Sequence, residues 1–245
     1  MENATLVALS RQIALRRNLD VIADNVANIT TDGFKRQALN FEEFVMPKAR
    51  ASSFERADRI NTFVADWTTT TDFGSGSIEQ SGNPLDVAIN GNGFFVVQTP
   101  DGERYTRAGN FRIDNGGRLV TADGQPVLGE GGEILFEQNE IGIEIGADGS
   151  IASSAGVKGR LRLVAFEDDR LLRKAGANLF ETDAAPEPAV GVQVMQGAIE
   201  RSNVSGVVEM TRMINATRSY EQITKVIKDQ DELRSRAISR LGQLN

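Results

Sequence analysis

The sequence contains neither cysteine nor histidine among its 245 residues. The absence of cysteine excludes a disulfide framework, a thiolate nucleophile and a thiolate-bound metal. The absence of histidine removes the most common general base and the most common transition-metal ligand. Together these absences exclude Ser–His–Asp, Cys–His and zinc chemistry, and we predict no catalytic residue, no cofactor and no metal site.

Basic clusters are also absent, and the formal net charge is −7. An acidic chain gains nothing from counterion release at a phosphate backbone, so we predict no nucleic-acid partner. The 34 acidic residues leave a two-carboxylate glycosidase as the one enzyme class that the composition permits. The candidate pairs, Asp168 with Asp169 and Glu137 with Glu140, have the pattern of solvated loop charges. We therefore predict that the protein is not an enzyme and has no small-molecule substrate.

Long apolar runs are missing as well. No stretch approaches the roughly 18 uninterrupted apolar residues that a membrane-spanning helix needs. Residues 1–20 carry charges at Glu2, Arg11, Arg16 and Arg17 and contain no continuous apolar region. We therefore expect no cleavable secretory signal at this end of the sequence.

What is present divides the sequence into four parts. Residues 1–34 favour a helix, because no Gly or Pro interrupts them before Gly33, which we expect to cap the helix in the left-handed conformation. Residues 35–82 form an extended connector with a few short strands. Residues 83–196 show short apolar runs between Gly-rich turns, the pattern of an antiparallel β-domain. Residues 197–245 contain a second long helix. We predict a mainly β central domain with long N- and C-terminal α-helices that pair as a coiled-coil-like α domain.

The C-terminal helix has a seam of residues at alternating spacings of three and four, which is the 3.5-residue period of a coiled coil. The seam positions are Met213, Ala216, Tyr220, Ile223, Ile227, Gln230, Arg234, Ala237, Leu241 and Leu244. The N-terminal helix is the candidate partner, but its apolar residues occupy two faces, Leu6, Leu9 and Ile13 on one and Leu15, Leu19, Ile22, Val26 and Ile29 on the other. Burial on all sides explains this pattern, and so does contact with neighbouring molecules, which we favour.

Several sequence blocks carry a resemblance to a known family. They are residues 18–36 (NLDVIADNVANITTDGFKR), 83–97 (NPLDVAINGNGFFVV), 105–111 (YTRAGNF), 117–121 (GRLVT), 200–204 (ERSNV) and 210–221 (MTRMINATRSYE). The sequence resembles the flagellar axial proteins, the family of rod, hook and hook-associated subunits. The blocks cover both ends and the middle of the chain, although the family signature has a second Asn where this chain has Asp24.

The resemblance implies a structural subunit of the flagellar basal body, located in the periplasm-spanning rod and exported by the flagellar type III apparatus without a cleaved signal. Within the family, the length, the first residues and the moderate central domain favour a proximal-rod member, with a distal-rod member as the alternative. The implied activity is assembly through the terminal helices, which transmits torque and forms the wall of the export channel. The implied partners are other rod proteins, copies of this chain and the export apparatus.

The predicted assembly interface lies on the terminal segments. It comprises Leu19, Ile22, Asn25, Val26, Asn28, Ile29, Asn203, Met213, Tyr220, Ile223, Ile227 and Leu241. For Asn25 and Asn28 two roles stay open, capping at a helix end and hydrogen bonding between subunits. Two other classes of protein also stay open: a secreted β-rich binding module that dimerises through its C-terminal helix, and a peptidoglycan hydrolase.

Overall fold

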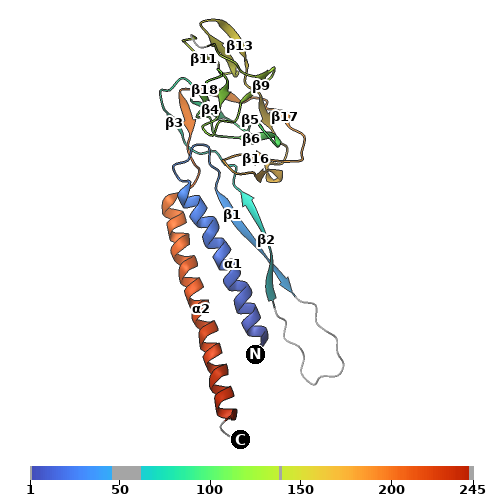
Figure 1. Cartoon of the computed structure of the whole chain (residues 1–245), viewed down its shortest axis with the longest axis vertical. Helices are drawn as coiled ribbons and strands as arrows, with labels where there is room; N and C mark the ends of the chain where they lie inside the picture. Colours follow the sequence, from blue (N-terminus) through green and yellow to red (C-terminus); the bar gives the residue numbers. More distant parts are fainter. Residues whose placement is uncertain (1, 46–61, 138–139, 243–245) are drawn as a thin grey trace. The chain divides into compact units, whose positions relative to one another are not determined.

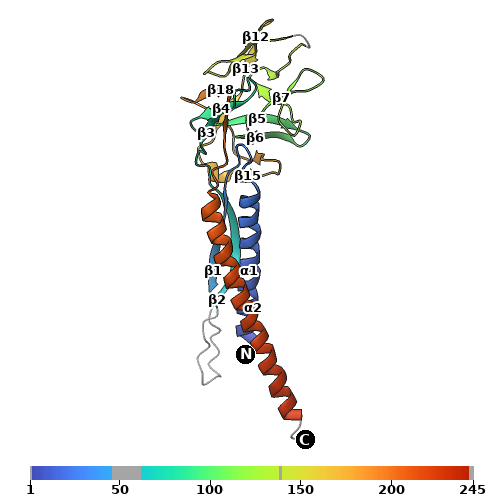
Figure 2. The same ribbon diagram turned by 90° about the vertical axis from the view of Figure 1, so that its left-hand side faces the viewer.

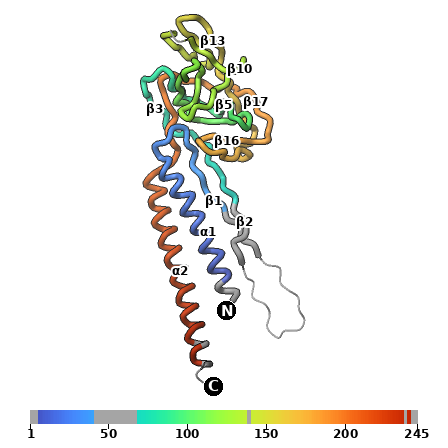
Figure 3. The backbone as a smooth tube through the Cα atoms, viewed as in Figure 1, coloured from blue at the N-terminus to red at the C-terminus, as the bar shows by residue number. Residues whose placement is uncertain are grey.

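The computed structural model describes residues 2–45, 62–137 and 140–242, and Figure 3 traces the backbone through them. Within these ranges the side chains of residues 2–5, 41–45, 62–67, 237, 238, 241 and 242 are not described. The described chain is mainly β with two long helices, as the sequence predicts. It divides into two compact units: the helical unit, formed by the described residues within 1–27, 37–70 and 205–245, and the β unit, formed by those within 28–36 and 71–204.

The helical unit contains α1 (Glu2–Ala27) and α2 (Gly206–Gly242), which lie side by side in Figures 1 and 2. It also contains the paired strands β1 (Gln37–Val45) and β2 (Thr62–Thr71). Gln12 Nε2 donates to Thr224 Oγ1 at 3.1 Å, and Asn25 Nδ2 lies 3.5 Å from Glu209 Oε2. The earlier residue of α1 thus faces the later residue of α2, so the two helices run antiparallel.

The centre of the β unit is a six-stranded antiparallel sheet in the order β15-β16-β6-β5-β14-β17. Its strands are β5 (Phe94–Thr99), β6 (Gly102–Thr106), β14 (Leu163–Ala165), β15 (Arg173–Lys174), β16 (Phe180–Glu181) and β17 (Glu187–Pro188). One apolar cluster packs around Phe95 and Val97, and a second packs around Phe94 and Val96. Alternate residues of β5 therefore serve opposite faces of the sheet, which explains why the whole run 94–97 is buried.

Smaller antiparallel pairings surround this sheet. Four of them are two-stranded: they join β3 (Ile78–Gln80) to β19 (Ala198–Glu200), β4 (Val87–Asn90) to β18 (Gln193–Gln196), β7 (Arg112–Ile113) to β8 (Leu119–Val120), and β9 (Leu128–Gly129) to β10 (Gly132–Glu133). The fifth has three strands, with β12 (Ser150–Ser153) between β11 (Glu144–Ile145) and β13 (Gly156–Arg160). A short 3-10 helix, η1 (Asp169–Leu171), follows β14.

Some strand patterns extend less far than the sequence indicates. Ile141, Ile143 and Ile145 alternate, yet only Glu144–Ile145 forms a strand there, and Ile141 is 74% exposed. The reason is Gly142, whose φ of +65° turns the backbone out of the extended conformation. Both expected helices are present, α1 over Glu2–Ala27 and α2 over Gly206–Gly242. No helix in the described ranges is long and apolar enough to cross a membrane.

Gly33 adopts the left-handed conformation that the sequence predicts, with φ +67°, but it does not cap α1. The helix ends at Ala27, and Gly33 instead lies inside the β unit, where its N–H donates to the carbonyl oxygen of Glu200 at 2.7 Å. A Cβ at this position would lie 2.4 Å from the backbone nitrogen of Ala108. Glycine is thus required by its torsion angle and by the close approach of two backbones.

This close approach predicts that Gly33→Ala destabilises the β unit by about 3 kcal/mol or more, since the left-handed strain and a backbone clash add together. Gly82→Ala is the matched control, because Gly82 has φ +76° and no heavy atom within 4 Å of an added Cβ. It retains only the torsional strain, about 1 kcal/mol. Urea unfolding of both variants measures the difference, and equal losses would contradict the close approach.

Candidate assembly interface

The α1 residues of the predicted interface lie on the side of the helix that the chain itself covers. Ile22 is 4% exposed and Asn25 is 1% exposed, while Leu19 and Val26 are half-buried. Ala14 is buried on the same side of α1. The cover comes from α2 and β1, which both contact α1.

The seam residues of α2 also lie on the side of their helix that the chain itself covers. Ala216 is buried, and Met213, Tyr220, Ile223 and Ile227 are half-buried, whereas their neighbours on other sides of the helix are exposed. From residue 231 to residue 236 every α2 side chain is exposed. The helix continues past the N-terminal end of α1 in Figures 1 and 2, so the seam of this last part has no cover from α1. The side chain of Leu241 lies outside the described residues.

A second apolar face of α1 stays open to solvent. Leu6 is 52% exposed, Leu9 46% and Ile13 45%, and at 100° per residue these three share one side of the helix. The α2 helix also exposes Met210, at 57%, and Ile214, at 53%. Isolated exposed apolar residues are ordinary, but rows of them along two packed helices are typical of protein–protein interfaces.

Asn25 ties α1 to β1 within the helical unit. Its Nδ2 donates to the carbonyl oxygen of Gln37 at 2.8 Å, and its Oδ1 accepts from the Gln37 N–H at 2.9 Å. The carboxylate of Glu209, which is 1% exposed and accepts from Arg212 at 2.6 Å, lies beside the same amide. Both ends of the Asn25 amide therefore have partners within the chain, and no cap is needed to explain the residue.

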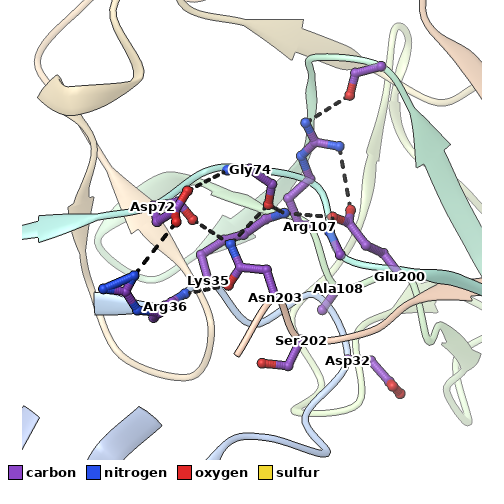
Figure 4. A network of polar contacts seen from close by, with 12 residues as sticks. Asp32, Lys35, Arg36, Asp72, Gly74, Arg107, Ala108, Glu200, Ser202 and Asn203 are labelled. Carbon is purple, nitrogen blue, oxygen red and sulfur yellow. Dashed lines mark hydrogen bonds and ion pairs between the residues drawn. The ribbon is translucent and has the colours of Figure 1, made fainter. Parts of the chain in front are cut away.

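The other predicted residues, Asn28, Ile29 and Asn203, belong to the β unit. Asn28 Oδ1 accepts from the Thr31 hydroxyl at 3.1 Å, and Ile29 is half-buried. Asn203 joins two segments: its Nδ2 donates to the carbonyl oxygens of Asp72 and Gly74, and its Oδ1 accepts from the Arg36 N–H at 2.7 Å. These three residues are thus parts of the β unit's own packing, and Figure 4 shows the contacts of Asn203.

Beside Asn203 lies a buried ion cluster, also drawn in Figure 4, which consists of Lys35, Arg107 and Glu200. Lys35 Nζ donates to Glu200 Oε1 at 2.6 Å, and Arg107 Nη1 lies 3.5 Å from Glu200 Oε2. All three residues are 2% exposed or less. Burial of charges at this depth is costly unless they are paired, so the cluster is a major constraint on the fold.

The cluster also donates to and accepts from backbone groups, and the Arg107 guanidinium lies over the Phe94 ring, 5.1 Å from its centroid. Lys35 Nζ also donates to the carbonyl oxygen of Gly74 at 2.9 Å, and Arg107 Nη2 donates to that of Gly91 at 2.9 Å. The Gly76 N–H donates to Glu200 Oε1 at 2.9 Å. Burial lowers the pKa of Lys35 below its ordinary value of 10.5, and burial also lowers the pKa of Arg107.

The acidic pairs considered for a hydrolase have structural partners. Asp168 caps η1 and accepts hydrogen bonds from Arg170, which lower its pKa. Glu140 is paired with Lys158, and it accepts from the Glu137 N–H at 2.9 Å. Burial raises the pKa of Asp169, the residue that follows Asp168. Asp168 and Glu140 thus hold a cap and an ion pair, which are common structural roles.

Sequence reasoning missed Lys35, Arg107 and Glu200, although each lies in a block that carries the family resemblance. Charged residues are solvated in most proteins, so a single Lys, Arg or Glu gives no signal of burial in one sequence. Their separation by 93 and 165 residues along the chain leaves no local pattern that would join them. Only the tertiary structure brings them together.

Comparison of the sequence with known proteins finds flagellar relatives. Three family models match: a flagella basal body rod protein model at residues 6–35, the D1 domain of the flagellar hook proteins FlgE/F/G at 88–153, and the C-terminal domain of the basal body rod proteins FlgEFG at 195–240. The chain is 39% identical, over the whole of both chains, to the flagellar basal-body rod protein FlgF of Caulobacter vibrioides.

Two further relatives extend the comparison. The chain is 34% identical to the rod protein FlgF of Mesorhizobium japonicum, over 99% of each chain. It is 35% identical to the rod protein FlgG of Bacillus subtilis, over 88% of this chain and 90% of the relative.

The lowered pKa of Lys35 predicts a pH dependence. Between that pKa and 10.5 the unfolded chain binds more protons than the folded chain at this site, so the stability contributed by residue 35 rises with pH. The charged groups that act on Lys35 are Glu200, Arg107, Asp72 and Asp169. We expect the stability of the native chain to rise relative to Lys35→Met from neutral pH toward 10.5. Urea unfolding at several pH values tests this, and a constant difference would contradict it.

Proposed function

This chain belongs to the family of flagellar basal-body rod proteins, and on that premise we propose that it is a structural subunit of the proximal rod. The observation that carries the proposal is the 39% identity to a rod protein FlgF over the full length of both chains. Its activity is assembly with other rod proteins and with copies of itself. In the rod it transmits torque and contributes to the wall of the export channel, and it performs no catalysis.

The distal rod is the alternative position, and the extent of similarity favours the proximal one. The FlgF relatives match from end to end, whereas the FlgG of Bacillus subtilis matches 88% of this chain at 35% identity. We also propose that the chain reaches the rod through the flagellar type III export apparatus. We propose that the division into residues 1–34, 35–82, 83–196 and 197–245 marks segments with separate roles in that assembly.

Assembly uses the terminal helices. The seam of α2 packs along α1 as a coiled-coil-like pair, which the half-buried positions Met213, Tyr220, Ile223 and Ile227 support. The opposite face of α1, with Leu6, Leu9 and Ile13 about half exposed, contacts neighbouring subunits. Burial of such side chains contributes roughly 25 cal/mol per Å² of apolar surface removed from water.

Helix formation is coupled to this assembly. A long helix with one covered seam and a second open apolar face gains only part of its packing energy within one chain, and most helical stability in proteins comes from such packing. The terminal segments are therefore partly unfolded in the free subunit and become fully helical in the rod.

We expect the dilute subunit to show less helix by circular dichroism than α1 and α2 together require. The helical signal should rise when the subunit polymerises, because neighbours then cover the open apolar faces. Circular dichroism at increasing protein concentration, with sizing in parallel, measures both changes. A dilute monomer with complete, cooperatively melting helices would rule out the coupling, and a closed dimer would favour a secreted binding module over a growing rod.

The seam predicts that Ile223→Asp abolishes rod assembly while the β unit stays folded, because a carboxylate cannot be buried between helices without a partner. Gln222→Asp is the matched control, since Gln222 is exposed and adjacent. It introduces the same charge and should leave assembly intact. Motility of complemented cells and electron microscopy of their basal bodies provide the measurement. Normal rods with Ile223→Asp would refute the claim that assembly depends on the seam.

The open face of α1 predicts a separate effect for Leu9→Asp. Leu9 is 46% exposed within the chain, so the substitution should leave the isolated subunit unchanged and block its assembly. A photoreactive amino acid at position 9 should crosslink to another axial protein in native flagella, and Gln222 serves as the control position. The outcome that contradicts the prediction is normal motility with Leu9→Asp and no crosslink from position 9.

A further inference from the structure

The buried ion cluster joins segments from the beginning, middle and end of the β unit. Lys35 precedes the first strand of the unit, Arg107 follows β6, and Glu200 ends β19, the last strand. The Glu200 carboxylate accepts from Lys35, from Arg107 and from the Gly76 N–H. One carboxylate therefore ties together four segments of the chain.

The charges of the cluster make Glu200 indispensable to it. Lys35 and Arg107 are both cationic, and Glu200 is the carboxylate that bonds both of them. Burial lowers the pKa of both cations, so the site already opposes their charge. Without the Glu200 carboxylate, two adjacent cations would have to leave water with no directly bonded counter-charge, which is strongly unfavourable.

The backbone around Glu200 pairs with other segments of the β unit, next to the ion cluster. Its strand β19 pairs with β3, and the Glu200 carbonyl accepts from the Gly33 N–H at 2.7 Å. The Arg201 N–H donates to the carbonyl oxygen of Ser77 at 2.8 Å. When residues 198–203 dock, they thus place the carboxylate and also complete the pairing of β19 with β3.

We propose that Glu200 is a latch that makes the folding of the β unit wait for the end of its sequence. Residues 28–36 and 71–197 hold both buried cations. They do not reach their compact fold until residues 198–203 dock and supply the carboxylate. The docking of this segment is therefore part of the rate-limiting step of folding.

The latch gives the chain a definite order of events. Chains are synthesised from the N-terminus, so Glu200 leaves the ribosome after the rest of the cluster. Until then the β unit stays open, which suits a subunit that passes through an export channel unfolded. This consequence rests on the proposed function, whereas the latch itself concerns only the folding of the isolated chain.

The test compares Glu200→Gln with the native full-length chain. Gln keeps the size of the side chain and an acceptor for the Gly76 N–H, but it removes the charge. The latch predicts that the unfolding equilibrium constant of the β unit rises on the order of 100-fold. Most of this change should appear as slower refolding, because the carboxylate acts in the rate-limiting step. Dilution from urea, with pulsed hydrogen exchange read in β4 and β5, follows the β unit alone.

Two further variants separate charge from shape. Lys35→Met leaves Arg107 and Glu200 as a neutral pair, so it should refold at about the native rate. Lys35→Met combined with Glu200→Gln removes one of the two buried cations, so it should recover a substantial part of the rate lost in Glu200→Gln. Glu79→Gln is the matched control, because Glu79 is an exposed carboxylate on β3 that pairs with Arg201 at 2.8 Å. It should change the equilibrium constant by less than about fivefold.

Three results would overturn the latch. The first is a Glu200→Gln chain with native stability. The second is a Glu200→Gln chain that refolds at the native rate and merely unfolds faster, since residues 198–203 would then dock after the barrier. The third is a double variant, Lys35→Met with Glu200→Gln, that refolds no faster than Glu200→Gln alone. If Glu200→Gln alone fails to fold, the latch is overturned when the double variant fails to fold as well. None of these results depends on rod assembly, so the proposed function stands or falls separately.

Discussion

The β unit depends on one electrostatic constraint, the compensation of two buried cations by the Glu200 carboxylate. The net value of a buried ion pair is small, because desolvation offsets most of its attraction, but the removal of one partner is severely destabilising. Here the asymmetry is greater than in a simple pair, since one anion serves both Lys35 and Arg107. The cluster therefore specifies which segments must meet more than it adds to overall stability.

The helical unit follows a different principle. Its interior is apolar apart from Asn25 and Glu209, and no comparable ion cluster holds its helices in the described residues. The apolar surface of α1 lies on two sides, and the partner helix covers only one of them. A self-sufficient β unit and a helical unit with open apolar faces are what an assembling subunit requires, because the first keeps its shape while the second gains stability from neighbours.

Much of this organisation was predictable from local patterns. The two helices, the antiparallel β region and the partial burial of α2 from Met213 to Ile227 agree with the hydrophobic periodicity, which depends only on residues a few positions apart. The pattern was insufficient where a single backbone torsion overrides it. Gly142 keeps Ile141 out of the strand that the alternating isoleucines indicate, and Gly33 adopts its predicted torsion angle at a backbone contact within the β unit. The interface role of residues such as Asn25 stays a prediction, since the structure shows its partners within one chain.

The two helices, the β region and the family could be recognised from periodicity and short signature blocks, because both are local and do not depend on the fold. The sequence also excluded whole classes of chemistry through the absence of cysteine and histidine. The antiparallel direction of α1 and α2, and the buried site that Lys35, Arg107 and Glu200 share, became visible only in the folded chain. Charge compensation acts through space between residues far apart in the chain, so no local sequence pattern predicts it.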